Sequence, residues 1–242
     1  MRTLCLSKRT AKEILRDPLN LAFGLGFPLV LLVLLSVIQS NVPVSLFEIE
    51  SLAPGVCVFG LSFVTLFSAT LISRDRKSAL MERLYTTPLT ARDFILSYTL
   101  PLLPIAVGQT VICYFASLVF GLDLSVKILL AIILSIPVSG FFISLGLLFG
   151  SILGDKQVGG ICGALLTNLS AWLSGTWFDL GLVGGVFEKI ANLLPFVHAV
   201  EMERAVFLGN YADILPHLIW VLGYAVFATV LAVLLFLRQM KK

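Results

Sequence analysis

The sequence predicts an all-α integral membrane protein with six transmembrane helices, and two observations lead to that fold class. Of the 242 residues, 58% are hydrophobic and only 13% are charged, whereas about a quarter of the residues of a soluble domain are charged. A soluble fold of this size has too little interior to bury so much apolar surface. The apolar residues also fall into runs of about 20, the length that crosses a bilayer as a helix.

Six such runs follow one another along the chain, and each is interpreted as a transmembrane span. They are Leu21–Gln39, Leu52–Ser73, Phe94–Phe120, Val126–Leu153, Val158–Phe178 and Ile214–Leu237. The first run follows a basic stretch, as the core of a signal peptide would, but it is longer than a typical signal core and no cleavage-like site follows it. It is therefore expected to persist as the first span.

The segment before the first span, residues 1–18, is predicted to be an amphipathic interface helix that ends at Pro18. Its apolar side chains can share one helical face: Leu4, Ala11, Ile14 and Leu15. Its basic side chains lie largely on the other faces: Lys8, Arg9, Lys12 and Arg16. Such a helix lies in the membrane surface, where its basic residues meet anionic headgroups of the lipid bilayer. The alternative is a disordered basic leader that only sets the topology.

The loop between the second and third spans, residues 74–93, is predicted to contain a short charged helix. Leu80 and Leu84 are four residues apart and give this helix an apolar edge. A Thr-Pro pair ends it, because the residue before a proline avoids the helical region. Thr90 and Asp93 then have the spacing of a capping box for the third span. A rigid charged helix on a tight loop predicts a contact with a soluble partner.

Lysine and arginine are unequally distributed between the two sides of this arrangement. Of the 17 basic residues, 14 lie before the first span, between the second and third, after the fourth, or at the end of the chain. With six spans these positions share one face of the membrane, and only Lys127, Lys189 and Arg204 lie on the other. Because basic residues are retained on the cytoplasmic side, both termini are expected in the cytoplasm.

The segment between the fifth and sixth spans, residues 179–213, is predicted to be extracellular or re-entrant. Pro195 divides it into two pieces, each too short to cross a bilayer. His198, Glu201 and Arg204 recur at three-residue spacing, which predicts an ion-paired lip near the exit of a pathway. A solvated helix face is the alternative for these three residues.

Polar and small residues inside the spans leave two further alternatives open. Asn168 and Trp172 in the fifth span, and Gln109 in the third, either line a pathway or hydrogen-bond between helices. Glycines at four-residue spacing allow close helix packing, either within the subunit or at a subunit interface: Gly146, Gly150, Gly154, Gly159 and Gly163. The four cysteines and two histidines lack ligand spacing, so no metal site is expected.

Three motifs carry a resemblance that covers essentially the whole chain. They are Leu52-Ala-Pro-Gly55, Glu82-Arg-Leu-Tyr-Thr-Thr-Pro88 and Leu194-Pro-Phe-Val-His-Ala-Val-Glu-Met-Glu-Arg204. With them the chain resembles the permease subunits of ATP-binding-cassette (ABC) exporters, a family that includes bacterial drug, polysaccharide and teichoic-acid exporters. That family's loop usually carries an acidic residue followed by Gly-Thr; here Asp75 takes the place of the usual glutamate, and Ala79-Leu80 replaces Gly-Thr.

The resemblance implies a half-transporter that forms its translocation path with a second permease copy or a homologous permease. It also implies a cytoplasmic coupling helix that contacts a separate ATPase subunit through four loop residues: Leu80, Glu82, Arg83 and Leu84. The chain contains no G-x-x-x-x-G-K-[ST] phosphate loop. It is therefore expected to bind no cofactor itself, with ATP and Mg used by the partner, and no nucleic acid partner is expected.

The leading functional hypothesis is ATP-driven export of a drug, peptide or lipid-linked compound, as in multidrug efflux, across a bacterial plasma membrane. The alternatives are an ion-driven secondary transporter and an intramembrane enzyme. An ion-driven transporter usually places carboxylates in mid-span, and none of the 14 acidic residues clearly lies there. The spans also lack the HExxH, paired-aspartate or Ser/His patterns of an enzyme.

Overall fold

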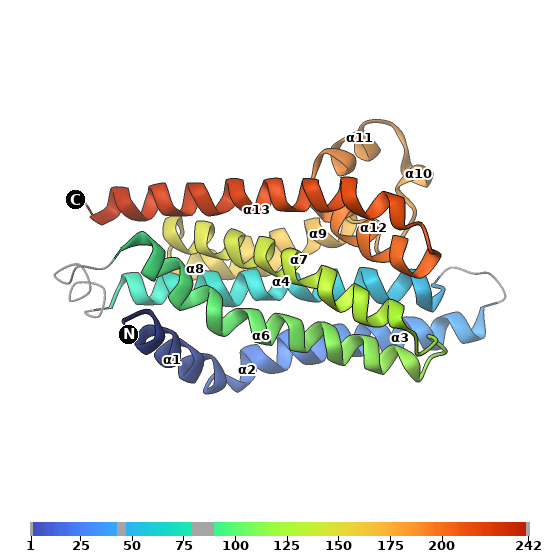
Figure 1. The fold of residues 1–242 in the computed structure, drawn as a ribbon, viewed down its shortest axis with the longest axis horizontal. Helices are drawn as coiled ribbons and strands as arrows, with labels where there is room; N and C mark the ends of the chain where they lie inside the picture. The colour runs from blue at the N-terminus through green and yellow to red at the C-terminus, as the bar shows by residue number, and fades with distance from the viewer. Residues whose placement is uncertain (1, 43–46, 79–89, 241–242) are drawn as a thin grey trace.

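The computed structural model describes residues 2–42, 47–78 and 90–240, and within these ranges the chain is all-helical (Figure 1). Five helices are long and apolar enough to cross a membrane, judged by length and composition. They are Ala22–Asn41, which joins the π-helical η1 (Ala22–Gly26) to α3 (Phe27–Asn41), then α4 (Ile49–Arg76), α6 (Ala91–Leu118), α7 (Val126–Ile152) and α13 (Tyr211–Met240). The predicted all-α character is confirmed for the described part of the chain, with five candidate spans; the sixth span stays a prediction.

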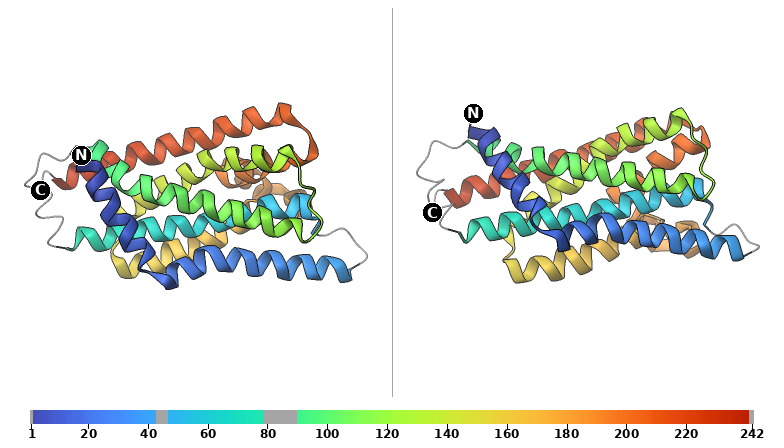
Figure 2. Two further views of the ribbon diagram at one scale, coloured as in Figure 1. Left: turned by 60° about the horizontal axis from the view of Figure 1, so that its bottom comes forward. Right: turned by 90° about the horizontal axis from the view of Figure 1, so that it is seen from below.

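The long helices lie side by side in an elongated bundle, and the two ends of the chain lie at the same end of it (Figures 1 and 2). We call this the basic end and the opposite one the far end. Helix α4 forms the centre: 89% of its apolar window is buried, against 17% for α13. Side chains on the outer face of α13 are apolar and exposed, as expected of a helix that faces lipid.

The predicted fifth span, Val158–Phe178, is not among the five candidates of the described residues, and it stays a prediction. The stretch consists of α8 (Asp155–Val158), the π-helical η2 (Gly159–Leu166) and α9 (Thr167–Leu173). The first five residues of η2 include three glycines, a residue type with low helix propensity. Figure 2 shows this stretch running along the bundle from the basic end towards the far end.

The α4–α7 interface explains the glycines of α7. A Cβ atom at Gly146 would lie 2.4 Å from the Cβ of Ser68, and one at Gly150 would lie 2.8 Å from the Cβ of Ile72. The hydroxyl of Thr65 donates a hydrogen bond to the Phe142 carbonyl at 2.7 Å across the same interface. These two glycines therefore serve close packing within the subunit.

Helix α1 (Arg2–Leu15), predicted from the N-terminal pattern, is confirmed, and it crosses the basic end at a steep angle to the spans (Figure 2). The residues of its predicted apolar face differ in exposure. Ile14 packs in the core, whereas Leu4 and Leu15 are each 68% exposed. The short helix α2 (Pro18–Leu21) then leads into the first span.

The far end holds three short helices: α10 (Leu180–Val183), α11 (Gly185–Leu193) and α12 (Pro195–Leu208). The division predicted at Pro195 is confirmed, since this proline occupies the first turn of α12, where its missing N–H is not needed. Helix α12 enters the bundle against α13, α4 and α7. Its interior face is buried, with Val200 and Met202 both inaccessible, so it is more enclosed than a solvated extracellular helix would be.

Candidate functional site

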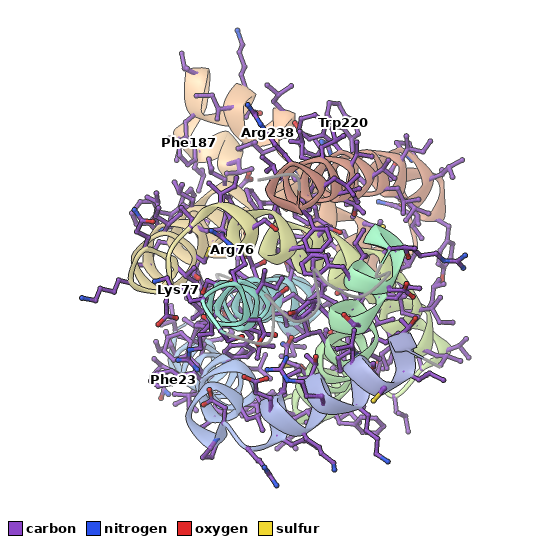
Figure 3. The ribbon with its side chains drawn as sticks, turned by 90° about the vertical axis from the view of Figure 1, so that its left-hand side faces the viewer. Phe23, Arg76, Lys77, Phe187, Trp220 and Arg238 are labelled. Atoms are coloured by element: carbon purple, nitrogen blue, oxygen red, sulfur yellow. The ribbon has the colours of Figure 1, made fainter. Side chains whose placement is uncertain are left out.

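The C-terminal turn of α4 ends in three charged residues, Arg74, Asp75 and Arg76, which contact four other helices. We call them the Arg-Asp-Arg clamp. Successive residues of an α-helix point about 100° apart, so one turn of α4 reaches neighbours in several directions. In the view from the basic end, Arg76 lies among the helices whereas Phe23 and Phe187 lie at the periphery (Figure 3). The clamp directly precedes the loop predicted to contact a soluble partner.

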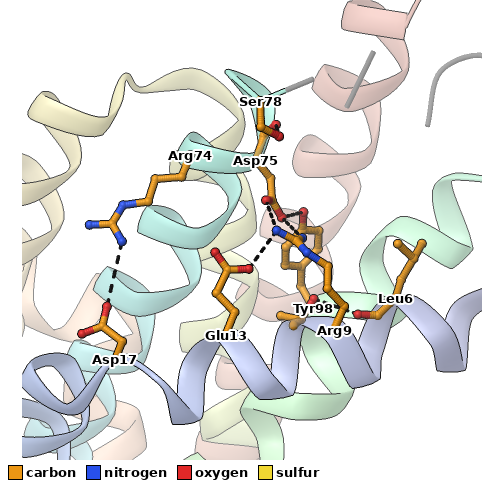
Figure 4. A network of polar contacts seen from close by, with 9 residues as sticks. Leu6, Arg9, Glu13, Asp17, Arg74, Asp75, Ser78 and Tyr98 are labelled. Carbon is orange, nitrogen blue, oxygen red and sulfur yellow. Dashed lines mark hydrogen bonds and ion pairs between the residues drawn. The ribbon is translucent and has the colours of Figure 1, made fainter. Parts of the chain in front are cut away.

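Asp75 lies at the centre of the clamp and is only 3% exposed. Its carboxylate accepts hydrogen bonds from both terminal nitrogens of Arg9, each at 2.7 Å, and from the Tyr98 hydroxyl at 2.6 Å (Figure 4). Bidentate arginine–carboxylate pairs are among the strongest hydrogen bonds in proteins. The hydrogen bond to Asp75 raises the pKa of Arg9 above its ordinary value. Asp75 therefore joins α4 to α1 and to α6.

The two arginines of the clamp attach α4 to other helices. Arg76 donates to the carbonyls of Gly150, at 2.8 Å, and Leu153, at 3.4 Å, where α7 ends. These carbonyls lack intrahelical donors and carry the negative end of the helix dipole, so a cation stabilises them. Arg74 pairs with Asp155 of α8 at 3.4 Å and with Asp17 at 3.9 Å. Both of those pairs are partly exposed and contribute at most about 1 kcal/mol.

A second contact ties α1 to the other end of the loop. The Thr3 hydroxyl donates a hydrogen bond to Oδ1 of Asp93 at 2.6 Å. Asp93 also completes the predicted capping box with Thr90, which is confirmed: the Thr90 side chain accepts from the Asp93 N–H, and the Asp93 side chain accepts from the Thr90 N–H. Helix α1 therefore holds the last turn of α4 and the first turn of α6, the two helices that flank the loop.

The basic residues of α1 divide into two groups. Lys8, Lys12 and Arg16 are exposed and line an open groove of about 850 Å³ between α1 and the end of α4, consistent with contact to anionic headgroups. Arg9 was expected to do the same, but the structure turns it inward onto Asp75. Beside it, Glu13 pairs with Arg9 at 2.8 Å, and burial raises the pKa of the Glu13 carboxyl.

Sequence reasoning missed three residues of this site: Asp75 as an ion-pair partner, Tyr98 and Thr3. The signal that could have found Asp75 is its position directly between two arginines, Arg74 and Arg76. The predicted partner-contacting residues lie outside the described residues: Leu80, Glu82, Arg83 and Leu84.

The polar residues predicted inside the spans fall in two environments. Gln109 is buried and its amide lies 3.4 Å from the Cys57 carbonyl and 3.5 Å from Sγ of Cys113, which favours helix–helix hydrogen bonding. Asn168 is exposed and donates to the Ala164 carbonyl at 2.7 Å. Trp172, one turn further along α9, is 51% exposed. Asn168 and Trp172 thus lie on one exposed face of α9.

The predicted lip residues do not form one cluster. Arg204 pairs with Glu201 at 2.8 Å, and it also donates to the Ser51 carbonyl of α4 at 3.1 Å and the Gly175 carbonyl at 2.8 Å. The Nδ1 atom of His198 instead lies 2.8 Å from Nδ1 of His217. Within the described ranges, no three His, Cys, Asp or Glu side chains group as metal ligands would.

Comparison with known proteins gives one family and two relatives. The family model described as "ABC-2 type transporter" matches residues 2–208. The chain is 27% identical over 246 residues to a protein named as the transport permease ycf38 of Porphyra purpurea, covering 96% of this chain and 83% of that protein. It is 28% identical over 229 residues to the ycf38 of Pyropia yezoensis, covering 89% and 78% of the two chains.

Proposed function

Because the chain belongs to the ABC-2 type transporter family, we propose that it is the membrane-spanning subunit of an ATP-driven exporter. Membrane subunits of this family work with an ABC ATPase and typically have no ATPase site of their own. In our proposal, the separate ATPase hydrolyses ATP with Mg as its cofactor. The energy released enters this multi-pass membrane protein through the loop between α4 and α6.

The observation that carries the proposal is the attachment of both flanks of this loop to α1. Arg9 binds Asp75 at the end of α4, and Thr3 binds Asp93 at the start of α6. The first of these contacts is bidentate, and its acceptor is almost wholly buried, so it resists displacement. A push on the loop therefore moves α1, α4 and α6 together, and Arg76 passes the displacement to α7.

The translocation path in this proposal forms between two permease copies, or between this chain and a homologous permease. Its support is the exposed face of α9, where Asn168 presents an amide and Trp172 an aromatic ring. Polar groups at membrane depth are placed preferentially along pathways. A cargo with both apolar and polar parts fits such a lining: a drug, a peptide or a lipid-linked compound, as in multidrug efflux.

The sixth span and the location belong to the proposal as well. The stretch from α8 to α9 runs along the bundle and would serve as the sixth crossing, with both termini in the cytoplasm. We propose the plasma membrane of a bacterium as the location; the two relatives come from red algae. An ion-driven transporter or an intramembrane enzyme is the weaker reading, because the family match favours an ABC permease over both.

The proposal is tested by co-expressing the chain with a candidate ABC ATPase from the same genome and reconstituting the purified pair in vesicles. The pair should copurify and move a fluorescent amphipathic probe only when ATP and Mg are supplied. The permease purified alone should hydrolyse no ATP above a detergent blank, since it has no phosphate loop. Hydrolysis by the pure permease, or probe movement without ATP, would contradict the half-transporter assignment.

A further inference from the structure

Helix α12 carries a carboxyl group into the interior of the bundle near the far end. Glu203 is 0% exposed. Its Oε2 accepts a hydrogen bond at 2.5 Å from the hydroxyl of Tyr114 on α6, which is also fully buried. Its Oε1 is buried and finds no hydrogen-bond partner among the residues that the structure describes. The export mechanism proposed above makes no use of this group.

The nearby cations on the packed elements are engaged elsewhere. The ammonium of Lys127 on α7 donates to the Phe207 carbonyl at 2.6 Å. The Arg204 guanidinium binds Glu201 and two backbone carbonyls.

The remaining titratable groups around α12 bring no positive charge to Glu203 either. Helices α4 and α6 contribute the buried thiols of Cys57 and Cys113. On the α13 side, His217 is bonded to His198 of α12. No described cation forms an ion pair with Glu203.

A buried carboxylate without a cation is far less stable than the neutral acid, because burial penalises the charged form. Burial raises the pKa of Glu203 to about 8, and the hydrogen bond from Tyr114 offsets only part of that effect. Helix α12 lies outside the five candidate spans. In the conformation described here, Glu203 therefore holds a proton at neutral pH.

We propose that Glu203 and Tyr114 form a proton-binding site, occupied while their hydrogen bond joins α12 to α6 and emptied when water reaches the carboxyl group. On emptying, the O–H bond of the acid breaks, its electron pair stays on the carboxylate, and the proton passes to water as hydronium. The link to transport rests on the proposed function, since it requires α12 and α6 to separate during the cycle.

The first test uses the full-length chain in detergent without any ATPase, and measures thermal unfolding from about pH 5 to about pH 9. An unfolded glutamate has a pKa of about 4.3, so between that value and about 8 only the native state holds this proton. Stability should therefore fall as pH rises through this window. Unfolding of the wild type should release about one proton more than unfolding of Glu203→Gln, whose pH slope should be correspondingly smaller.

Glu201→Gln is the matched control, because Glu201 lies two residues earlier on α12 and is partly exposed and paired with Arg204. It should keep the wild-type slope. Tyr114→Phe should move the transition to higher pH, since it removes a donor that favours the charged form. Equal pH slopes for the wild type and Glu203→Gln would overturn the proposal.

A second measurement covers the case in which Glu203→Gln does not fold. The infrared spectrum of the wild-type chain should contain the C=O band of a protonated, buried carboxylic acid at pH 7 that is lost at about pH 10. A wild-type spectrum without that band at pH 7 would overturn the proposal. Neither measurement involves ATP or transport, so failure of the export assignment would leave both results standing.

Discussion

At the residue scale, Asp75 shows how one side chain can organise the basic end of the bundle. Its carboxylate accepts three hydrogen bonds from two helices that are far from it in sequence. Arg9 supplies two of them from a side chain that is 38% exposed, so water still reaches the guanidinium. Removing the carboxylate would therefore leave a hydrated arginine rather than a buried unpaired charge. The cost is then that of lost charge-assisted hydrogen bonds.

Asp75→Asn should lower the free energy of unfolding by about 1–3 kcal/mol, because hydrogen bonds to charged groups are worth about that much. It should also reduce ATP-driven transport while leaving copurification with the ATPase intact. Thermal unfolding in detergent and vesicle transport measure the two effects.

Glu13→Gln serves as the control for Asp75→Asn, because it removes only the partly exposed pair with Arg9. It should change stability by less than about 1 kcal/mol. A wild-type unfolding temperature together with wild-type transport for Asp75→Asn would show that the clamp has no part in coupling.

At the element scale, the sequence predicted the features that depend on neighbouring residues in the chain. It did not predict the features that depend on tertiary contacts. The capping box at Thr90 and the division at Pro195 depend on neighbours in sequence, and both are confirmed. The inward turn of Arg9 depends on a partner 66 residues away, which no local pattern reveals. The apolar length of the predicted fifth span was visible in sequence, whereas the π-helical segment Gly159–Leu166 within it was not.

Glu82→Lys tests the loop as a coupling element. If Glu82 meets a basic or backbone-donor site on the ATPase, the substitution removes an attraction and adds a repulsion, which costs about 2–5 kcal/mol for a buried pair. Export and substrate-stimulated ATPase activity should both fall, while expression and membrane insertion stay at wild-type levels. Export and ATPase activity are measured in reconstituted vesicles. Expression and membrane insertion are measured by quantifying the protein in the membrane fraction.

Glu82→Gln is the graded control for this substitution, since it removes the attraction without adding a positive charge. Its effect should be smaller than that of Glu82→Lys. Wild-type transport and wild-type ATPase copurification for the lysine variant would show that the loop is only a connector.

At the scale of the whole molecule, five helices and both chain ends are arranged as the distribution of basic residues predicted. The end of α4, the start of α6, α8 and the end of α13 meet at one end of the bundle (Figure 1). By the positive-inside rule, we expect the basic residues at this end to face the cytoplasm. Of the six spans predicted from apolar length, five correspond to candidate membrane-spanning helices in the described residues.

The native cysteines provide a test of this topology. Cys5 on α1 is exposed, whereas Cys57, Cys113 and Cys162 are buried. A membrane-impermeant maleimide should therefore label the protein in inside-out vesicles and leave it unlabelled in right-side-out cells. Cys5→Ser should abolish the labelling, as a control for the site. Labelling of Cys5 from outside intact cells would invert the topology.

The tight contact between α4 and α7 has a mechanical consequence. Because Gly146 and Gly150 leave no room between the two helices, α4 cannot slide along α7 and the pair must rotate or tilt as one stiff lever. This lever is about 42 Å long, from the 28 residues of α4. Arg204 donates a hydrogen bond to the Ser51 carbonyl in the first turn of α4, and the last turn of α4 carries Asp75. A displacement at the basic end of α4 is therefore expected to tilt α7 with it.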